Sequence, residues 1–477
     1  MENYDYILIG GGPTSLTLAY YLSKYNNKIL LIEQQSIIGG VHRVDRTHNN
    51  MFSDHSPRIY LNNYFSLIDI LSNMGLQFDD LFTKYNFSIN SSIQENISKF
   101  TYKEILAIIC EFIKFCIDDN PSKKVTMIEF VRSYNFSDST IAFLDSLCRS
   151  IDGGSIDNFT KWEFFQTINQ NFFYSVYEPK LCNDVSLFKH WEKALLDTGN
   201  VTIMLNTEVT KINSTDRVNN ITIQNKSTLS TISAKNYIFC VPPTPMLKIL
   251  QNSDNKNILG DINKFVKFEK ASRYLIYIPV TFHWNYIVKN IKKKWGGALI
   301  TDYDIVYIVM SDYMDFQDDR SKTVICCAAK ALDRKSKYNN KTANECNEQE
   351  LIVEVFRQLN GQQPDLPEPT TSILSAGVYK DKNNEWNNTD AAFFNSVIGG
   401  CSNKSIYNNL FFCGVQNMLS EYNFTSFESA IENAIALLHE LEPKTINTVL
   451  IHKPVTIKNV LIIMLIIVVL VLAYLMT

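Results

Sequence analysis

The first residues of the chain show two apolar runs on either side of an amphipathic stretch. Residues 6–9 and 29–32 are almost wholly apolar, and between them Leu16, Ala19 and Leu22 recur at helical spacing. Short apolar runs bounded by turn residues indicate buried strands, and apolar residues three and four positions apart indicate one face of a helix. The pattern therefore predicts a βαβ unit within residues 1–60, followed by a loop.

The remaining pattern alternates between helical and strand-like regions. Residues 61–190 are mostly helical, and residues 200–245 and 270–332 follow strand patterns. The predicted helices cover residues 65–76, 103–118, 127–134, 138–150, 185–197, 347–359 and 426–441. The predicted strands cover residues 201–205, 209–212, 220–224, 237–241, 273–282, 305–311, 323–332 and 410–414.

Strands of the N-terminal type recur far apart in the chain. We therefore expect an α/β fold with a Rossmann-like domain assembled from residues 1–62, 195–255 and 385–442. The two insertions, residues 63–194 and 256–384, would form an α+β substrate domain. Residues 443–458 would link this body to the C-terminal segment.

The C-terminal segment from Val460 to Thr477 carries no charge and consists almost wholly of Leu, Ile, Val and Met. At about 1.5 Å per residue it extends about 27 Å as a helix, close to the thickness of a bilayer core. Lys453 and Lys458 flank its N-terminal side. We therefore expect residues 459–477 to be a transmembrane tail anchor in a cellular or viral-factory membrane, with the body on the cytosolic side. The alternative is a buried C-terminal helix.

The turn after the first apolar run has the chemistry of a dinucleotide site. Gly10 permits a tight turn, and Gly12 lets the backbone approach a pyrophosphate. The helix that begins at Pro13 and Thr14 would aim its free N–H groups at the phosphates. Glu33 ends the second strand, where a carboxylate accepts hydrogen bonds from ribose hydroxyls. The alternative is a glycine turn that holds no ligand.

Composition and charge weigh against several other classes. Of the 477 residues, 45% are hydrophobic, and the net charge of −4 gives no reason to expect a nucleic-acid partner. The 10 cysteines include no Cys-x-x-Cys pair, which favours reduced thiols over disulfides or a zinc site. His residues do not occur close to acidic or Cys residues in a pattern typical of metal ligands, so we expect no metal site. The heavy use of Asn, Ile, Lys and Tyr is typical of an AT-rich genome, such as that of a large DNA virus or a protist.

Four local motifs together resemble the flavin-containing amine oxidase superfamily. They are the glycine turn with Glu33, the Ile-Gly-Gly run at residues 38–40, the strand ending in Val-Pro-Pro at residues 241–243, and the segment from Gly414 to Glu428. The resemblance covers roughly residues 1–440 and implies FAD, held non-covalently, rather than NAD. The cofactor-binding residues implied are Gly10, Gly12, Pro13, Thr14, Ser15, Glu33, Gly39, Gly40, Arg43, Val209, Gly414, Thr425 and Ser426.

The same resemblance implies where each motif would lie on FAD. The second glycine pair would lie beside the pyrophosphate, and the strand that contains Val209 near the adenine. Gly414 and the last helix would face the flavin ring, where the helix dipole stabilises negative charge on the reduced ring. Thr425 and Glu428 are predicted to form the capping box of that helix. The loop of residues 53–58 would pass close to the flavin.

The sequence departs from the family where the chemistry would take place. Ser15 stands at the third glycine position, and two residues separate the second glycine pair from Arg43. The family's lysine near flavin N5 precedes a strand ending in Phe-Trp, and here Lys270 and Arg273 lie nearest that place. The family's cage aromatic is missing, although Tyr422 is near enough to substitute. The catalytic residues are therefore unknown, with Lys270, Arg273 and Tyr422 as candidates.

The resemblance implies oxidation of a C–N bond in a small-molecule substrate such as an amine, with transfer to flavin N5 and reoxidation by O2. Two alternatives stay open. A sugar-nucleotide mutase resembling UDP-galactopyranose mutase would share the glycine turn, the Ile-Gly-Gly run and a Pro-x-x-Tyr pattern at residues 57–60. A non-catalytic FAD-binding component of a membrane or particle would account for the departures.

Overall fold

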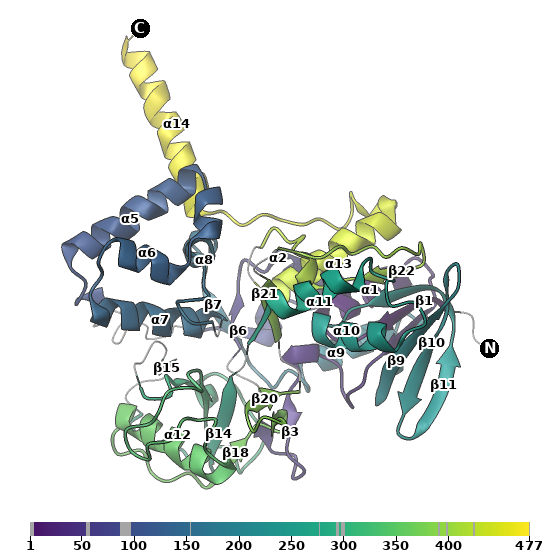
Figure 1. Ribbon diagram of the computed structural model, residues 1–477, viewed down its shortest axis with the longest axis horizontal. Coiled ribbons are helices and arrows are strands. Elements are labelled where there is room, and N and C mark those ends of the chain that lie inside the picture. Colours follow the sequence, from purple (N-terminus) through teal and green to yellow (C-terminus); the bar gives the residue numbers. More distant parts are fainter. Residues whose placement is uncertain are drawn as a thin grey trace.

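The computed structural model describes residues 4–53, 58–85, 97–152, 154–275, 277–291, 295–296, 301–389, 392–396, 399–422 and 425–476. The chain forms three parts that pack together (Figure 1). A Rossmann-like part combines the N-terminal, middle and C-terminal segments, a helical part follows residue 100, and a second sheet lies between residues 278 and 374. The predicted dinucleotide site belongs to the first part.

A five-stranded parallel sheet forms the centre of the Rossmann-like part. Its strands are ordered β22 (Leu410–Phe412), β12 (Ala234–Phe239), β1 (Tyr4–Ile9), β2 (Ile29–Ile32) and β8 (Val201–Met204). In the central strand, Leu8 pairs with Ile238 on one side and with Leu31 on the other. Because all five strands are parallel, their carboxyl ends meet at one edge of the sheet.

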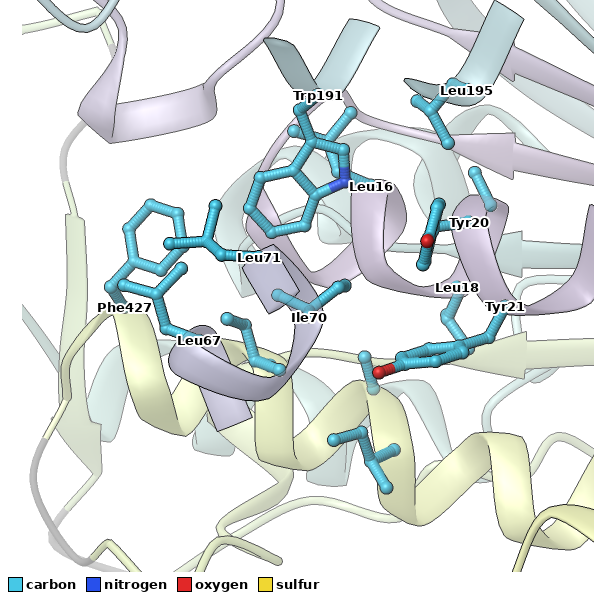
Figure 2. Close-up of a cluster of buried hydrophobic side chains, with 14 of the residues drawn as sticks. Leu16, Leu18, Tyr20, Tyr21, Leu67, Ile70, Leu71, Trp191, Leu195 and Phe427 are labelled. Atoms are coloured by element: carbon cyan, nitrogen blue, oxygen red, sulfur yellow. The ribbon is translucent and has the colours of Figure 1, made fainter. Parts of the chain in front are cut away.

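Apolar side chains on both faces of this sheet are buried, so it lies between two layers. Tyr6 and Leu8 pack in the layer of helices α1 (Pro13–Ser23), α2 (Phe65–Asn73), α9 (Leu187–Leu196) and α13 (Phe427–Leu441). Ile7 and Ile9 pack in the layer of α10 (Pro243–Asn252), α11 (Ile262–Ala271) and the antiparallel sheet β11 (Thr228–Ile232), β10 (Val218–Asn225) and β9 (Thr207–Ser214). Figure 2 shows Trp191 and Leu16 within the first layer, where each fully buried side chain of this size contributes about 1.5–3 kcal/mol.

Neighbouring strands of the second sheet run antiparallel to one another. Its order is β15 (Trp295–Gly296), β16 (Val306–Val309), β17 (Thr323–Ala329), β14 (Ile278–Trp284) and β18 (Thr371–Leu374). Helix α12 (Glu348–Gln362) covers one face, where Val355 and Leu359 are buried with Phe282. The shorter strands are β3 (Asp45–Arg46), β4 (Phe52–Ser53), β5 (Tyr60–Leu61), β6 (Phe82–Lys84), β7 (Val176–Pro179), β13 (Ser272–Leu275), β19 (Val378–Lys380), β20 (Trp386–Asn388) and β21 (Ala392–Ser396).

The helical part consists of α5 (Tyr102–Ile117), α6 (Met127–Ser133), α7 (Asp138–Asp152) and α8 (Lys161–Asn171), and α3 (Phe78–Leu81) precedes it in the chain. Phe130, Phe143 and Phe165 are central to its core. Three of its helices begin with a Thr N-cap and a Glu three residues later, each pair forming a capping box that satisfies free backbone N–H groups. These caps fix the helix starts independently of the core.

The structure divides one predicted strand and contains helices that were not predicted, among them α8, α10 and α11. The predicted strand over residues 273–282 is two strands, because β13 pairs with β21 and β14 pairs with β17 and β18. Helix α8 was not predicted, although Thr160 and Glu163 give it a capping box. The apolar pattern of a strand does not depend on which strand it pairs with. The break between β13 and β14 could therefore not be detected from periodicity alone.

The C-terminal segment forms the helix α14 (Ile457–Met476), which projects from the helical part (Figure 1). Among the described residues, no helix has the length and apolar character needed to cross a membrane. The predicted transmembrane tail anchor over residues 459–477 is therefore not supported.

Candidate cofactor site

The glycine turn lies at the carboxyl edge of the parallel sheet, between β1 and α1. Gly10 has a φ of +101°, and its N–H donates to the carbonyl of Ile32 at 2.8 Å. A Cβ at Gly10 would lie 2.7 Å from the carbonyl oxygen of Cys240, so only glycine fits here. Gly12 is the N-cap of α1 and supplies no side-chain cap, which leaves the first N–H groups of this helix available to an anion.

The second glycine pair packs directly on this turn. The N–H of Gly39 donates to the carbonyl of Gly11 at 2.7 Å. A Cβ at Gly40 would lie only 2.9 Å from the Cα of Gly12. Gly39 and Gly40 have φ values of 125° and 56°, which glycine adopts at little cost. Two backbones without side chains between them form the kind of concave surface that binds phosphate.

Glu33 ends β2 at the same edge and is 8% exposed. One of its carboxylate oxygens accepts a hydrogen bond from the N–H of Gly11, and the other accepts one from the N–H of Gln35 at 2.8 Å. These bonds hold the carboxylate beside the turn. The predicted contact of Glu33 with a ribose stays a prediction.

The first turn of α1 accommodates the departure at the third glycine position. The hydroxyl of Ser15 lies within hydrogen-bond distance of the carbonyl oxygens of Gly10 and Gly12, the latter at 2.9 Å. The hydroxyl of Thr14 donates to the carbonyl of Ala430 in α13 at 3.2 Å. A small hydroxyl group at position 15 is thus satisfied within the turn and does not prevent close packing.

Arg43 lies beside a small cavity between the second glycine pair and the hairpin of β19 and β20. Its Nε is 3.2 Å from Oδ1 of Asp45, and its Nη1 donates to the carbonyl of Gly40 at 3.3 Å. Asn388 is buried at the same cavity, where its amide donates to the carbonyl of Tyr277 at 2.9 Å. The cavity is lined by Gly40, Val41, Arg43, Asp45, Gly377, Asn388 and Thr389. The predicted Arg43 thus reaches the second glycine pair despite the two extra residues before it.

The closing segment of the predicted site comes from β22 and α13. Gly414 follows β22, and its N–H donates to Oδ1 of Asn417 at 2.8 Å. The N-cap of α13 is Ser426, whose hydroxyl accepts from the N–H of Ser429 at 3.1 Å. The predicted capping box of Thr425 and Glu428 is therefore wrong by one residue. It fails because Glu428 has a different partner.

Glu428 points its carboxylate at another helix. Its two oxygens accept from the N–H groups of Ser66 at 2.6 Å and Leu67 at 3.0 Å, which are free donors in the first turn of α2. Burial and the nearby charge of Glu432 raise the pKa of Glu428 to about 8, although the two N–H donors lower it. Glu428 thus joins α2 to the N-terminal end of α13.

The three catalytic candidates occupy different surroundings. Lys270 is exposed at the end of α11. Arg273, on β13, forms an ion pair with Glu163 of α8 and donates to the carbonyl of Asn158 at 2.6 Å. Tyr422 is fully buried and donates to Oδ1 of Asn171 at 2.6 Å. Of the three, Tyr422 is the nearest in sequence to the start of α13, and Arg273 joins two parts of the fold.

Several buried polar groups near the start of α13 were not predicted. The ring of Tyr64 lies 5.5 Å from that of Tyr422, and the ring of His42 lies 4.7 Å from that of Phe427. Glu432 accepts from the backbone N–H of Tyr422 at 3.0 Å, and burial raises its pKa. An acid four residues after Glu428 on the same helix was the available sequence signal.

Two other predicted positions complete the list. Val209 lies in β9 and is buried among the apolar residues between that strand and the parallel sheet. Its strand starts beside Glu33, because the N–H of Thr207 donates to the Glu33 carbonyl at 3.0 Å. In the predicted flavin loop, residues 54–57 lie outside the described residues. The adenine and flavin contacts of these segments stay predictions.

Comparison with known proteins agrees with this geometry. Residues 8–73 match the NAD(P)-binding Rossmann-like domain. A UDP-galactopyranose mutase from Mycoplasma pneumoniae is 26% identical over 102 residues, which is 18% of this chain and 26% of that protein. The chain thus matches only about a quarter of the length of this curated relative.

Solved structures match over nearly the whole chain. A putrescine oxidase bound to putrescine has a TM-score of 0.64 at 11% identity, covering 92% of this chain and 99% of that one. An oxidoreductase from Methanosarcina mazei has a TM-score of 0.60 at 13% identity, covering 91% and 99%. A candidate protoporphyrinogen oxidase from Exiguobacterium sp. 255-15 has a TM-score of 0.60 at 14% identity, covering 93% and 100%. The predicted family resemblance is therefore confirmed at the level of the fold: residues 8–73 match the model of the NAD(P)-binding Rossmann-like domain, and the chain shares its overall fold with the putrescine oxidase and the candidate protoporphyrinogen oxidase.

Proposed function

We propose that this protein is an FAD-dependent oxidoreductase of the amine oxidase type, acting on a small molecule with an oxidisable C–N bond. The observation that carries the proposal is the packing of Gly40 on Gly12 at the carboxyl edge of the parallel sheet. This surface is free of side chains, lies at the N-terminal end of α1, and suits the pyrophosphate of FAD.

The described residues fit the rest of the cofactor in the same order. Glu33 is held beside the glycine turn, which supports a contact with the ribose of the adenosine half, and the dipole at the N-terminal end of α13 would stabilise negative charge on a flavin ring bound there. When bound, FAD supplies the two-electron chemistry. The chain would bind the phosphates at the glycine turns and would present the N-terminal end of α13 to the ring.

An anaerobic titration tests the oxidase proposal. Purified full-length protein, reconstituted with FAD, is mixed without oxygen with a panel of monoamines, polyamines and amino acids. We expect at least one compound to bleach the flavin absorbance, and expect hydrogen peroxide once air is admitted. Bound flavin that no compound bleaches would contradict oxidase activity and favour the non-catalytic FAD-binding component.

The match to UDP-galactopyranose mutase favours one second candidate. A mutase would hold a nucleoside diphosphate with arginines, and Arg43 and Arg58 both lie near the second glycine pair, where Arg58 donates to the carbonyl of Val41. Interconversion of UDP-galactopyranose and UDP-galactofuranose by the chemically reduced protein, with no net flavin oxidation, would support the mutase. Amine-dependent peroxide production without any response to UDP-sugars would exclude it.

A further inference from the structure

Helix α5 has an inverted arrangement of polar and apolar side chains. Its two carboxylates, Glu104 and Glu111, are buried, where Glu104 accepts from the N–H groups of Thr101 and Ser137 at 2.7 Å and Glu111 pairs with Lys114 at 2.7 Å. Large apolar side chains are instead exposed, and they recur at helical spacing. The exposed apolar residues of α5 are Tyr102, Ile105, Leu106, Ile109, Ile113 and Ile117, which we name the outer face of α5.

This outer face continues toward the C-terminal helix. Burial raises the pKa of Cys116 near the end of α5, and the charge of Lys458 in the first turn of α14 partly opposes this rise. The N–H of Lys458 also donates to Oδ1 of Asn169 in α8 at 2.9 Å. Just beyond α8, Phe172 and Phe173 are exposed. Figure 1 shows α5 along the edge from which α14 projects.

The charges at the border of this surface are mainly positive. The exposed lysines near it are Lys99, Lys103, Lys114, Lys123, Lys124 and Lys453, whereas both acids within α5 are buried. Three of these lysines have acidic partners, because Lys114 pairs with Glu111, Lys123 with Asp119 and Lys453 with Glu421, and Asp118 at the end of the helix is exposed. An apolar surface bordered by lysines is typical of a contact with anionic lipid headgroups, to which each lysine near the surface contributes about 1 kcal/mol.

We propose that the outer face of α5 and the adjoining α14 form a docking surface for a bilayer that contains anionic lipids. A second copy of the chain would cover one side of each helix. In α14, however, every side chain from Leu461 to Leu472 is 39–64% exposed, so apolar groups face outward around its whole circumference. Lipid is the occupant that covers all sides of such a helix.

The exposed thiol of Cys110 provides a direct test, because it lies between Leu106 and Ile113 on the outer face of α5. The full-length protein is labelled there with an environment-sensitive thiol dye and mixed with vesicles of phosphatidylcholine, with or without phosphatidylserine. We expect a blue shift of the dye emission with the phosphatidylserine vesicles. The control carries the dye at Leu229→Cys on β11 in a Cys110→Ser background, and no shift is expected there.

A double substitution separates α5 from α14 as the cause of binding. Leu106→Gln with Ile113→Gln removes apolar contact without changing charge, and we expect the fold to be unaffected because both positions are exposed. We expect the vesicle partition coefficient to fall at least about tenfold, whereas Leu229→Gln leaves it unchanged. Undiminished binding by the double variant, absence of the dye shift, or a dye shift caused by raising the protein concentration without vesicles would each overturn the proposal. The last result would identify a second copy as the occupant.

Discussion

Single glycines decide whether FAD can enter the proposed site. At Gly10 a side chain would meet the carbonyl of Cys240, and at Gly40 it would meet the backbone of Gly12. Both positions also have positive φ, so two independent constraints act at each. Backbone atoms cannot rotate away as the end of a side chain can, so a side chain at either position could be accommodated only by a shift of the main chain.

A Gly40→Ala substitution tests this constraint. The added methyl group would lie 2.9 Å from the Cα of Gly12 and would fill the space between the two glycine motifs. We expect FAD occupancy of the purified protein to fall at least about tenfold, equivalent to about 1.4 kcal/mol. Gly199→Ala is the matched control, because Gly199 has a φ of +71° but no atom within 4 Å of an added Cβ. It should lose about 1 kcal/mol of stability and keep its FAD.

Glu428 gives the protein a pH dependence of a defined sign. Its pKa is about 8 in the folded protein against 4.5 as the ordinary value, so between these values the folded state holds the extra proton. The free energy of unfolding should therefore fall as pH rises from about 5 to 8, by up to about 1.4 kcal/mol per pH unit. Urea denaturation across this range measures the slope, and Glu428→Gln should flatten it.

The control for this slope is Glu129→Gln. Glu129 is exposed, and hydrogen bonds from the backbone and hydroxyl of Thr126 lower its pKa, so its contribution is lost as pH falls below its ordinary value. We expect Glu129→Gln to leave the slope between pH 5 and 8 unchanged. Equal slopes for wild type and Glu428→Gln in that range would show that Glu428 ionises as an exposed acid does.

At the scale of elements, ion pairs hold the inserted segments against one another. Arg273 on β13 reaches Glu163 on α8, and Asn395 on β21 donates to the same carboxylate. Lys330, next to β17, is fully buried with Asp304 at 3.4 Å, and donates to the hydroxyl of Ser150 on α7 at 2.6 Å. The helical part is thus attached to two separate sets of strands.

An Arg273→Gln substitution distinguishes attachment from catalysis. It leaves the carboxylate of Glu163, which is 6% exposed, without its cation, so the free energy of unfolding should fall by about 3 kcal/mol. Adding Glu163→Gln should restore part of this loss. We expect the rate of flavin reduction per bound FAD to be unchanged. A stable Arg273→Gln protein whose flavin is no longer reduced would instead identify Arg273 as a catalytic residue.

The sequence was sufficient to predict elements with a strong local signal. The predicted βαβ unit lies within a few residues of β1, α1 and β2. The predicted helices over residues 347–359 and 426–441 likewise lie within a few residues of α12 and α13, because caps and periodicity are local. The break between β13 and β14 and the partner of Glu428 depend on residues distant in the chain, which no local pattern contains. For the same reason, the cofactor residues could be listed from motifs, whereas the buried network around Tyr64 and Tyr422 could not.

At the scale of the whole molecule, the three parts divide the proposed tasks. The parallel sheet brings the ends of β1, β2, β12 and β22 to one edge, where segments from both ends of the chain meet. The small cavity at Arg43 and Asn388 is lined by residues that follow β2 and by residues within and beside the hairpin of β19 and β20. The proposed lipid surface lies on the helical part, apart from the glycine turns (Figure 1).

The central claim is that the two glycine motifs form an FAD site, and the flavin content of the protein tests it most directly. The full-length protein is incubated with excess FAD, freed of unbound cofactor by gel filtration, and its absorbance near 450 nm is compared with that at 280 nm, with Gly40→Ala treated alongside. The proposed site predicts about one FAD per wild-type chain and almost none in the variant. A colourless wild-type protein, or equal flavin in both proteins, would contradict it.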